Sequence, residues 1–222
     1  MSDRITVAEA KIKNDHSEQH TYVFEQDAVD AINAALVINR PLLIRGEPGA
    51  GKSQLAKAAA VVLKRTYIPF TISHSTEADD LLCSFDAVAR LADAQIEGAL
   101  CKDNDERCRA RERLAKANYL HPGPLWQALN WQSAWEQFAK IQLCQQQVDA
   151  GEDVAKACAV SGNPMSHYLN QDKALSSGAV VLIDELDKAD SSVPNGLLEV
   201  LGANRFHPEG MNKPVEAAGI SP

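Results

Sequence analysis

Apolar residues along the first third of this 222-residue chain follow helical and strand-like spacings in turn. Residues 24–37 carry them at helical spacing, which predicts a helix. The short apolar run at residues 42–44 stops at a glycine-rich stretch, and this pattern predicts a buried strand. Residues 52–64 are rich in alanine and leucine and favour a helix, whereas the β-branched and aromatic residues 66–72 favour a strand. Pro69 in that strand indicates an edge position.

Three elements are predicted near the C-terminal end of the sequence. Residues 179–183 form the most apolar strand-like run of the chain, and Asp184 follows it directly. Residues 193–201 favour a helix, and residues 204–217 have turn-forming residues in their middle, which predicts a hairpin. Strands and helices that alternate in this way predict an α/β fold.

The middle of the chain, residues 76–178, has a less regular pattern. Residues 77–94 are partly helical in pattern, and residues 151–177 are polar and predicted to be rich in loops. Residues 102–118 are dense in both charges, which predicts an exposed helix face, with a basic contact patch as the alternative. A later apolar stripe at helical spacing predicts a packing face, and it comprises Trp131, Ala134, Trp135, Phe138 and Ile141.

Length and composition limit the domain organisation and the function classes. The length suits one good-sized domain, and residues 1–20 are polar, which predicts an N-terminal tail before a domain at residues 21–222. The formal net charge of −8 and an aromatic content of 5% argue against non-specific nucleic-acid binding and base stacking. The N-terminus lacks a secretory signal, and no run reaches the roughly 18 apolar residues that a membrane span needs. The five cysteines form no CxxC pair and no zinc spacing with the histidines, so we expect reduced thiols in a cytoplasmic protein.

A glycine-rich loop with a specific chemistry follows the predicted strand at residues 42–44. The sequence GEPGAGKS at residues 46–53 fits the pattern G-x-x-x-x-G-K-[ST]. Glycines let the backbone curl so that its N–H groups point at phosphate oxygens, and the following helix offers its positive N-terminal end to the same anion. We therefore expect a nucleotide phosphate site, whose residues are Gly46, Glu47, Pro48, Gly49, Ala50, Gly51, Lys52, Ser53 and Gln54.

A pair of acids completes the predicted site. Asp184 and Glu185 stand at the C-terminal end of the predicted strand at residues 179–183, and that end of a strand suits a nucleotide crevice. Ser53 and Asp184 are the expected Mg²⁺ ligands. Glu185 is the expected catalytic residue because a carboxylate can orient and deprotonate an attacking water. The sequence thus predicts ATP hydrolysis as the reaction class, with ATP and Mg²⁺ as the cofactors, although these residues do not identify the nucleobase.

The two motifs together resemble the AAA+ ATPases, in particular their MoxR-like, dynein-related branch. RPLLIRGEPGAGKS at residues 40–53 is typical of that branch, as is DELDKAD at residues 184–190 followed by VPNGLLEVL. The resemblance covers roughly residues 22–222 and is densest at residues 38–63 and 178–217. It implies a P-loop NTPase core, an α/β three-layer sandwich, with Walker A and Walker B motifs at the two sites.

The resemblance also implies an insertion within the second helix of the core, at about residues 80–177 here, and a hairpin that residues 204–217 resemble. Spacing agrees independently, because 132 positions separate Lys52 from Asp184, whereas two βα units need only roughly 60–70 residues. Members of the branch continue with a fourth strand, a sensor residue, an arginine that reaches a neighbouring subunit, and a helical lid. The sequence given stops before those parts, so we expect it to be incomplete at its C-terminus.

Three functions follow as alternatives. The first is a MoxR-like ATPase that forms a homo-oligomeric ring, a hexamer, and remodels a protein client, possibly one with a von Willebrand type A domain. The second is a truncated module that binds nucleotide without turnover, because the sensor and arginine residues are missing from the sequence given. The third is a nucleic-acid motor, which the net charge of −8 disfavours.

Overall fold

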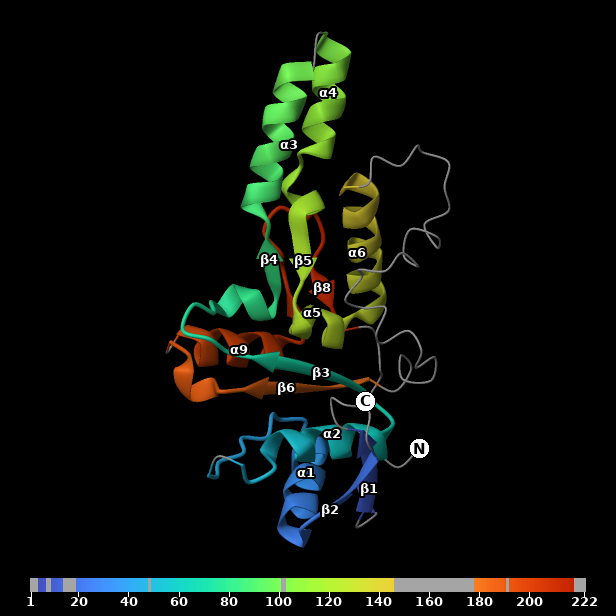
Figure 1. Ribbon diagram of the computed structural model, residues 1–222, viewed down its shortest axis with the longest axis vertical. Coiled ribbons are helices and arrows are strands. Elements are labelled where there is room, and N and C mark those ends of the chain that lie inside the picture. The colour runs from blue at the N-terminus through green and yellow to red at the C-terminus, as the bar shows by residue number, and fades with distance from the viewer. Residues whose placement is uncertain are drawn as a thin grey trace. The chain divides into compact units, whose positions relative to one another are not determined.

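The protein has a mixed α/β fold, and its structure is a computed structural model (Figure 1). The structure describes residues 4–6, 9–13, 19–47, 49–100, 103–145, 178–190 and 192–217. The segment predicted to be loop-rich at residues 151–177 lies outside the described residues. Contacts divide the chain into two compact units, the first made of residues 1–73 and 171–188 and the second of residues 74–170 and 189–222.

The first unit begins with a strand pair that the sequence did not predict. Strand β1 (Glu9–Lys13) pairs antiparallel with β2 (Gln19–Val23). Ala10 and Ile12 are 5% and 4% exposed, while Glu9 and Lys11, which alternate with them, are exposed. The prediction of a polar tail over residues 1–20 is therefore wrong for this strand pair. Polar residues dominate the composition there, but the apolar ones alternate with them, so one face of β1 is buried.

Two helices cover the apolar face of that strand pair. Helix α1 (Gln26–Ile38) and helix α2 (Lys52–Leu63) confirm the helices predicted from apolar spacing. Their inner residues form one core with the strand pair, and this core consists of Ile5, Ala10, Ile12, Phe24, Ile32, Leu55, Ala58 and Ala59. Helix α2 is thereby held by its alanine-rich face, so the start of the helix has a fixed position in the unit.

A parallel strand pair forms the other part of the first unit. Strand β3 (Thr66–Thr71) lies beside β6 (Ala179–Asp184) in Figure 1, with Thr66 opposite Ala179 and Thr71 opposite Asp184. The backbone N–H of Ile72 donates to the carbonyl of Asp184 at 3.0 Å and extends the ladder past the last pair. Both predicted strands are confirmed, and the two lie next to each other although they are far apart in sequence.

The apolar run at residues 42–44 does not form the buried strand that the sequence predicts. Leu42, Leu43 and Ile44 have no regular secondary structure and are 40%, 71% and 37% exposed. A strand is buried only when neighbours satisfy its N–H and C=O groups and cover its side chains. Within the described residues no strand pairs with this run, which explains why the apolar pattern alone gave the wrong result.

The second unit contains short strands, 3₁₀ turns and most of the described helices. Its elements in chain order are η1 (Ala78–Leu81), β4 (Cys83–Phe85), α3 (Ala87–Leu100), α4 (Asn104–Arg113), η2 (Lys116–Tyr119), β5 (Leu120–Pro122), α5 (Pro124–Leu129), α6 (Trp131–Gln145), α9 (Ser192–Ala203), β7 (Arg205–Phe206) and β8 (Val215–Glu216). Helix α9 and the β7–β8 hairpin confirm the helix and hairpin predicted near the C-terminal end.

The core of the second unit is built around Trp126 of α5, which is fully buried. Its indole N–H donates to Ser133 Oγ at 2.8 Å. Its ring packs edge-on against the Phe206 ring, with 5.7 Å between the ring centroids. Ala134 and Phe138 of α6 complete the cluster. The predicted packing face on α6 is confirmed, because its apolar stripe lies against this core or is itself buried.

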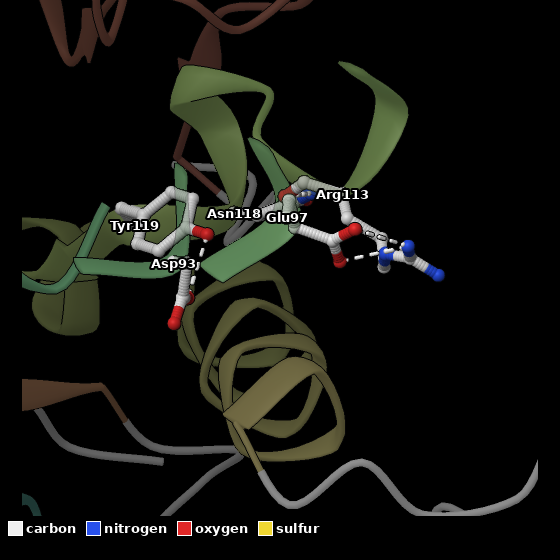
Figure 2. Close-up of polar contacts among 5 residues, drawn as sticks. All are labelled: Asp93, Glu97, Arg113, Asn118 and Tyr119. Carbon is white, nitrogen blue, oxygen red and sulfur yellow. Dashed lines mark hydrogen bonds and ion pairs between the residues drawn. The ribbon is translucent and has the colours of Figure 1, made fainter. Parts of the chain in front are cut away.

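Polar contacts join helix α3, helix α4 and the 3₁₀ turn η2 (Figure 2). Arg113 pairs with Glu97 at 2.7 Å, and the Tyr119 hydroxyl donates to Asp93 Oδ2 at 2.8 Å. The Asn118 amide donates to the carbonyls of Glu112 and Arg113 at 2.9 and 2.8 Å, and these bonds satisfy the end of α4. The side chains of α4 are otherwise largely exposed, so the exposed charged helix predicted within residues 102–118 is confirmed.

The second unit holds a close backbone contact that permits only glycine. A Cβ on Gly123 would lie 2.6 Å from the carbonyl oxygen of Asp80, whereas a Cβ on Gly98, within helix α3, meets nothing within 4 Å. We expect Gly123→Ala to lower the free energy of unfolding by about 1–3 kcal/mol. Gly98→Ala should raise that free energy by up to about 1 kcal/mol because alanine is the better helix former.

Urea unfolding followed by tryptophan fluorescence measures both variants, because all three tryptophans of the chain lie in this unit. Gly98→Ala serves as the matched control for the added methyl group. Equal shifts of the unfolding midpoint in the two variants would contradict the close contact at Gly123.

Candidate functional site

The glycine-rich loop passes into the first turn of α2 through residues with a left-handed backbone. Gly49 has φ of 82° and Gly51 has φ of 80°, a region that side chains disfavour. Gly51 is the N-cap of α2, and in the described part of the chain no side chain caps this helix. The N–H groups of the first turn have no partner within the helix, and they carry the positive end of its dipole. Such an end binds an anion.

The side chain of Lys52 bends back over the same loop. Its Nζ donates to the carbonyl oxygens of Gly46 at 2.8 Å and of Glu47 at 2.9 Å. Both acceptors are exposed backbone groups, so an incoming phosphate oxygen can replace them as partners of the ammonium group. The loop, the helix start and the lysine thus place positive potential at one point.

Ser53 and Asp184 join the two predicted motifs. The Ser53 hydroxyl donates to Asp184 Oδ2 at 2.7 Å, although 131 positions separate the two residues in sequence. Ser53 belongs to the first turn of α2, and Asp184 is the last residue of β6. Helix α2 also packs against both strands of the parallel pair. The contact therefore depends on the strand pairing and on the packing of α2 as well as on the two side chains.

Glu185 follows Asp184 in an unusual backbone conformation. Its φ is 58°, which is uncommon for a residue with a side chain. Its backbone N–H donates to Asp184 Oδ1 at 2.9 Å, and its carboxylate forms an ion pair with Lys188. The hydrogen bond that Lys188 donates to this carboxylate raises the pKa of the Lys188 ammonium group. Glu185 is exposed, so water can reach its carboxylate.

The oxygen atoms at this site suit Mg²⁺. A hydroxyl and a carboxylate are hard oxygen ligands, and Mg²⁺ takes only one or two protein ligands in nucleotide sites, with phosphates and waters as the rest. Among the described residues no three His, Cys, Asp or Glu side chains gather into a metal cluster. The loop and helix start fit a phosphate chain, and the Ser53–Asp184 pair fits the accompanying cation.

The structure brings most of the predicted site residues together. Those in the loop and first helical turn are Gly46, Glu47, Gly49, Ala50, Gly51, Lys52, Ser53 and Gln54, and Asp184 is joined to them through Ser53. Pro48 lies outside the described residues. Glu185 is next to Asp184, but the contacts described for it are with Asp184 and Lys188 and not with the loop.

Two residues outside the predicted set also belong to this neighbourhood. The ring of Tyr22 lies beside the loop, since a Cβ on Gly51 would be 3.9 Å from Tyr22 Cε2. Burial, followed by the charge of Glu25, raises the pKa of the Tyr22 hydroxyl. Lys188 pairs with Glu185, and the only signal for it in the sequence is a position three residues after an acid.

Two cysteine side chains are described by the structure. In the described part of the chain Cys83 and Cys108 are free thiols, and both lie in the second unit. Burial, with a smaller effect from Asp79, raises the pKa of the Cys83 thiol to about 11. Cys83 is therefore a poor nucleophile at neutral pH, because the thiolate is the reactive form.

Comparisons with known proteins yield no relative: no protein-family model, no curated protein and no solved structure matches the chain significantly. In the described part of the chain, no helix combines the length and the apolar character that crossing a bilayer requires. The two motifs and the geometry that joins them therefore carry the information about function.

The contact between Ser53 and Asp184 can be measured through a double-mutant cycle. We expect Ser53→Ala and Asp184→Ala to show a coupling energy of about 1.5–3 kcal/mol in urea unfolding, as a hydrogen bond to a charged group contributes about that much. Ser53→Ala combined with Asp187→Ala is the matched control, because Asp187 is exposed near the same strand end. A coupling below about 0.3 kcal/mol for Ser53 and Asp184 would contradict the contact.

Proposed function

We propose that this protein binds ATP with Mg²⁺ and hydrolyses it. The observation that carries the proposal is the hydrogen bond between Ser53 and Asp184, which joins the glycine-rich loop to the acidic end of β6. Each motif alone is a sequence pattern, but their meeting at 2.7 Å gives one site with a phosphate cradle and two oxygen ligands for a cation.

Each residue of the proposed site has a distinct role. The backbone N–H groups from Gly49 to Gln54 bind the phosphates, and Lys52 adds a charge toward the outer phosphate oxygens. Ser53 and Asp184 hold Mg²⁺, which when bound neutralises phosphate charge. Glu185 orients the attacking water and accepts its proton. Phosphoryl transfer depends mostly on positioning and electrostatic stabilisation, and these groups supply both.

The finer fold that we propose is the P-loop NTPase core of the MoxR-like AAA+ ATPases. The parallel pairing of β3 with β6 supports it, because that arrangement delivers Asp184 and Glu185 at a strand end next to the start of α2. The order of a glycine-rich loop, a helix, a strand and an acid-tipped parallel strand also supports it.

The proposed biological role rests on the resemblance of the two motifs to that branch. It is the remodelling of a protein client in the cytoplasm by a hexameric ring, with a von Willebrand type A domain as a candidate feature of the client. The net charge of −8 supports a protein partner over a nucleic-acid partner, since nucleic-acid binding depends on a basic surface.

Two substitutions separate nucleotide binding from hydrolysis. Lys52→Ala should weaken ATP binding and lower turnover at least about 100-fold, because the outer phosphates lose their charged partner. Glu185→Gln should lower kcat by about 100-fold with ATP affinity nearly unchanged, because only the water-orienting group is altered. Phosphate release under ATP saturation and an ATP-binding titration measure the two effects.

Lys140→Ala is the matched control, since Lys140 is an exposed lysine of the second unit. Wild-type turnover in both site variants would refute ATP hydrolysis at this site. ATP binding by the wild-type protein without any turnover would support the alternative of a nucleotide-binding module.

A further inference from the structure

Glu185 and Lys188 are connected twice, once through the backbone and once through their side chains. The backbone N–H of Lys188 donates to the carbonyl of Glu185 at 3.0 Å and closes the 3₁₀ turn η3 (Leu186–Lys188). The ammonium group of Lys188 then reaches back to Oε2 of the Glu185 carboxylate. The turn therefore fixes the backbone position of Lys188, and the ion pair fixes the position of the Glu185 carboxylate.

The backbone of Glu185 also restricts its side chain. The positive φ of 58° places this residue outside the extended conformation of β6, and its N–H is bound to Asp184 Oδ1. A residue in such a sparsely populated region is held there by its surroundings, and such residues are frequent at functional sites. The direction of the carboxylate is therefore set by the turn, and Lys188 is the side chain that holds its free end.

The ion pair has a specific partner and contributes little to folding. Asp187 is close enough to raise the pKa of Lys188, but the side-chain hydrogen bond goes to Glu185. The side chains of Lys188 and Glu185 are 42% and 43% exposed, and exposed pairs of this kind contribute little to stability. Removing the lysine should therefore leave the fold intact and change mainly the carboxylate.

We propose that Lys188 is a positioning residue, which holds the Glu185 carboxylate by Oε2 so that Oε1 is left to bind the attacking water. This inference rests on the proposed ATP hydrolysis and adds a residue to it. A general base works best when a third group orients it, and here the orienting group lies one turn after the base. Lys188 touches neither the glycine-rich loop nor Ser53 in the described contacts, so it acts through Glu185.

Steady-state ATP hydrolysis by Lys188→Ala and Lys188→Arg tests this role. Lys188→Ala should lower kcat about tenfold and leave KM for ATP within twofold, because the phosphate-binding groups are untouched. Lys188→Arg should restore most of the rate, since a single charged hydrogen bond can come from either side chain. Asp187→Asn is the matched control, because it changes a charge in the same turn without removing the ion pair, and it should keep wild-type kcat.

A cycle with Glu185→Gln separates a positioning role from a structural one. If Lys188 acts only through the Glu185 carboxylate, Lys188→Ala should have no further effect on single-turnover hydrolysis by Glu185→Gln. A tenfold loss that persists in that background, an unchanged kcat in Lys188→Ala, or a rise in KM alone would each overturn the inference while ATP hydrolysis stands. Absence of turnover in the wild-type protein would overturn the proposed function and this inference with it.

Discussion

The parallel pairing of β3 with β6 is the constraint on which the candidate site depends. It joins residues 66–71 to residues 179–184, so more than 100 residues of chain leave and return between the two strands. Closing a loop of that length is entropically unfavourable, although the cost grows only slowly with length. This entropic cost is offset by the ladder of backbone hydrogen bonds between the strands and by the packing of α2 against both of them. With the register fixed, the position of Asp184 is fixed as well.

The position of Ser53 follows from the packing of the same unit. Alanine residues on the inner face of α2 lie in a core shared with β1, β2 and α1, which fixes the start of the helix. The hydroxyl at that start then reaches Asp184, and the carboxylate that follows is turned by a left-handed backbone toward Lys188. The charges at the site are separated in space. Positive groups lie on the loop and at the start of α2, and the two acids lie at the end of β6.

Sequence reasoning identified the elements whose local pattern and tertiary role agree. Helix α2 and strand β6 are rich in apolar residues and pack against elements of their own unit, and the phosphate loop carries glycines where the backbone is left-handed. It failed where contacts with other elements decide whether a segment is buried or forms a strand. Residues 42–44 are apolar but have no partner strand in the described part of the chain, and β1 is polar in composition yet half-buried by alternation. Lys188 was missed because its only signal in the sequence is its position three residues after Glu185, and it is the 3₁₀ turn that brings the two side chains together.

Titration of ATP into the protein with and without Mg²⁺ shows whether Ser53 and Asp184 form a cation site, with Asp184→Asn measured beside the wild type. If Ser53 and Asp184 form a cation site next to the phosphate loop, Mg²⁺ should increase ATP affinity by about tenfold or more in the wild type and have little effect in Asp184→Asn. Equal ATP affinity with and without Mg²⁺ in the wild type, or no ATP binding in either condition, would contradict the account.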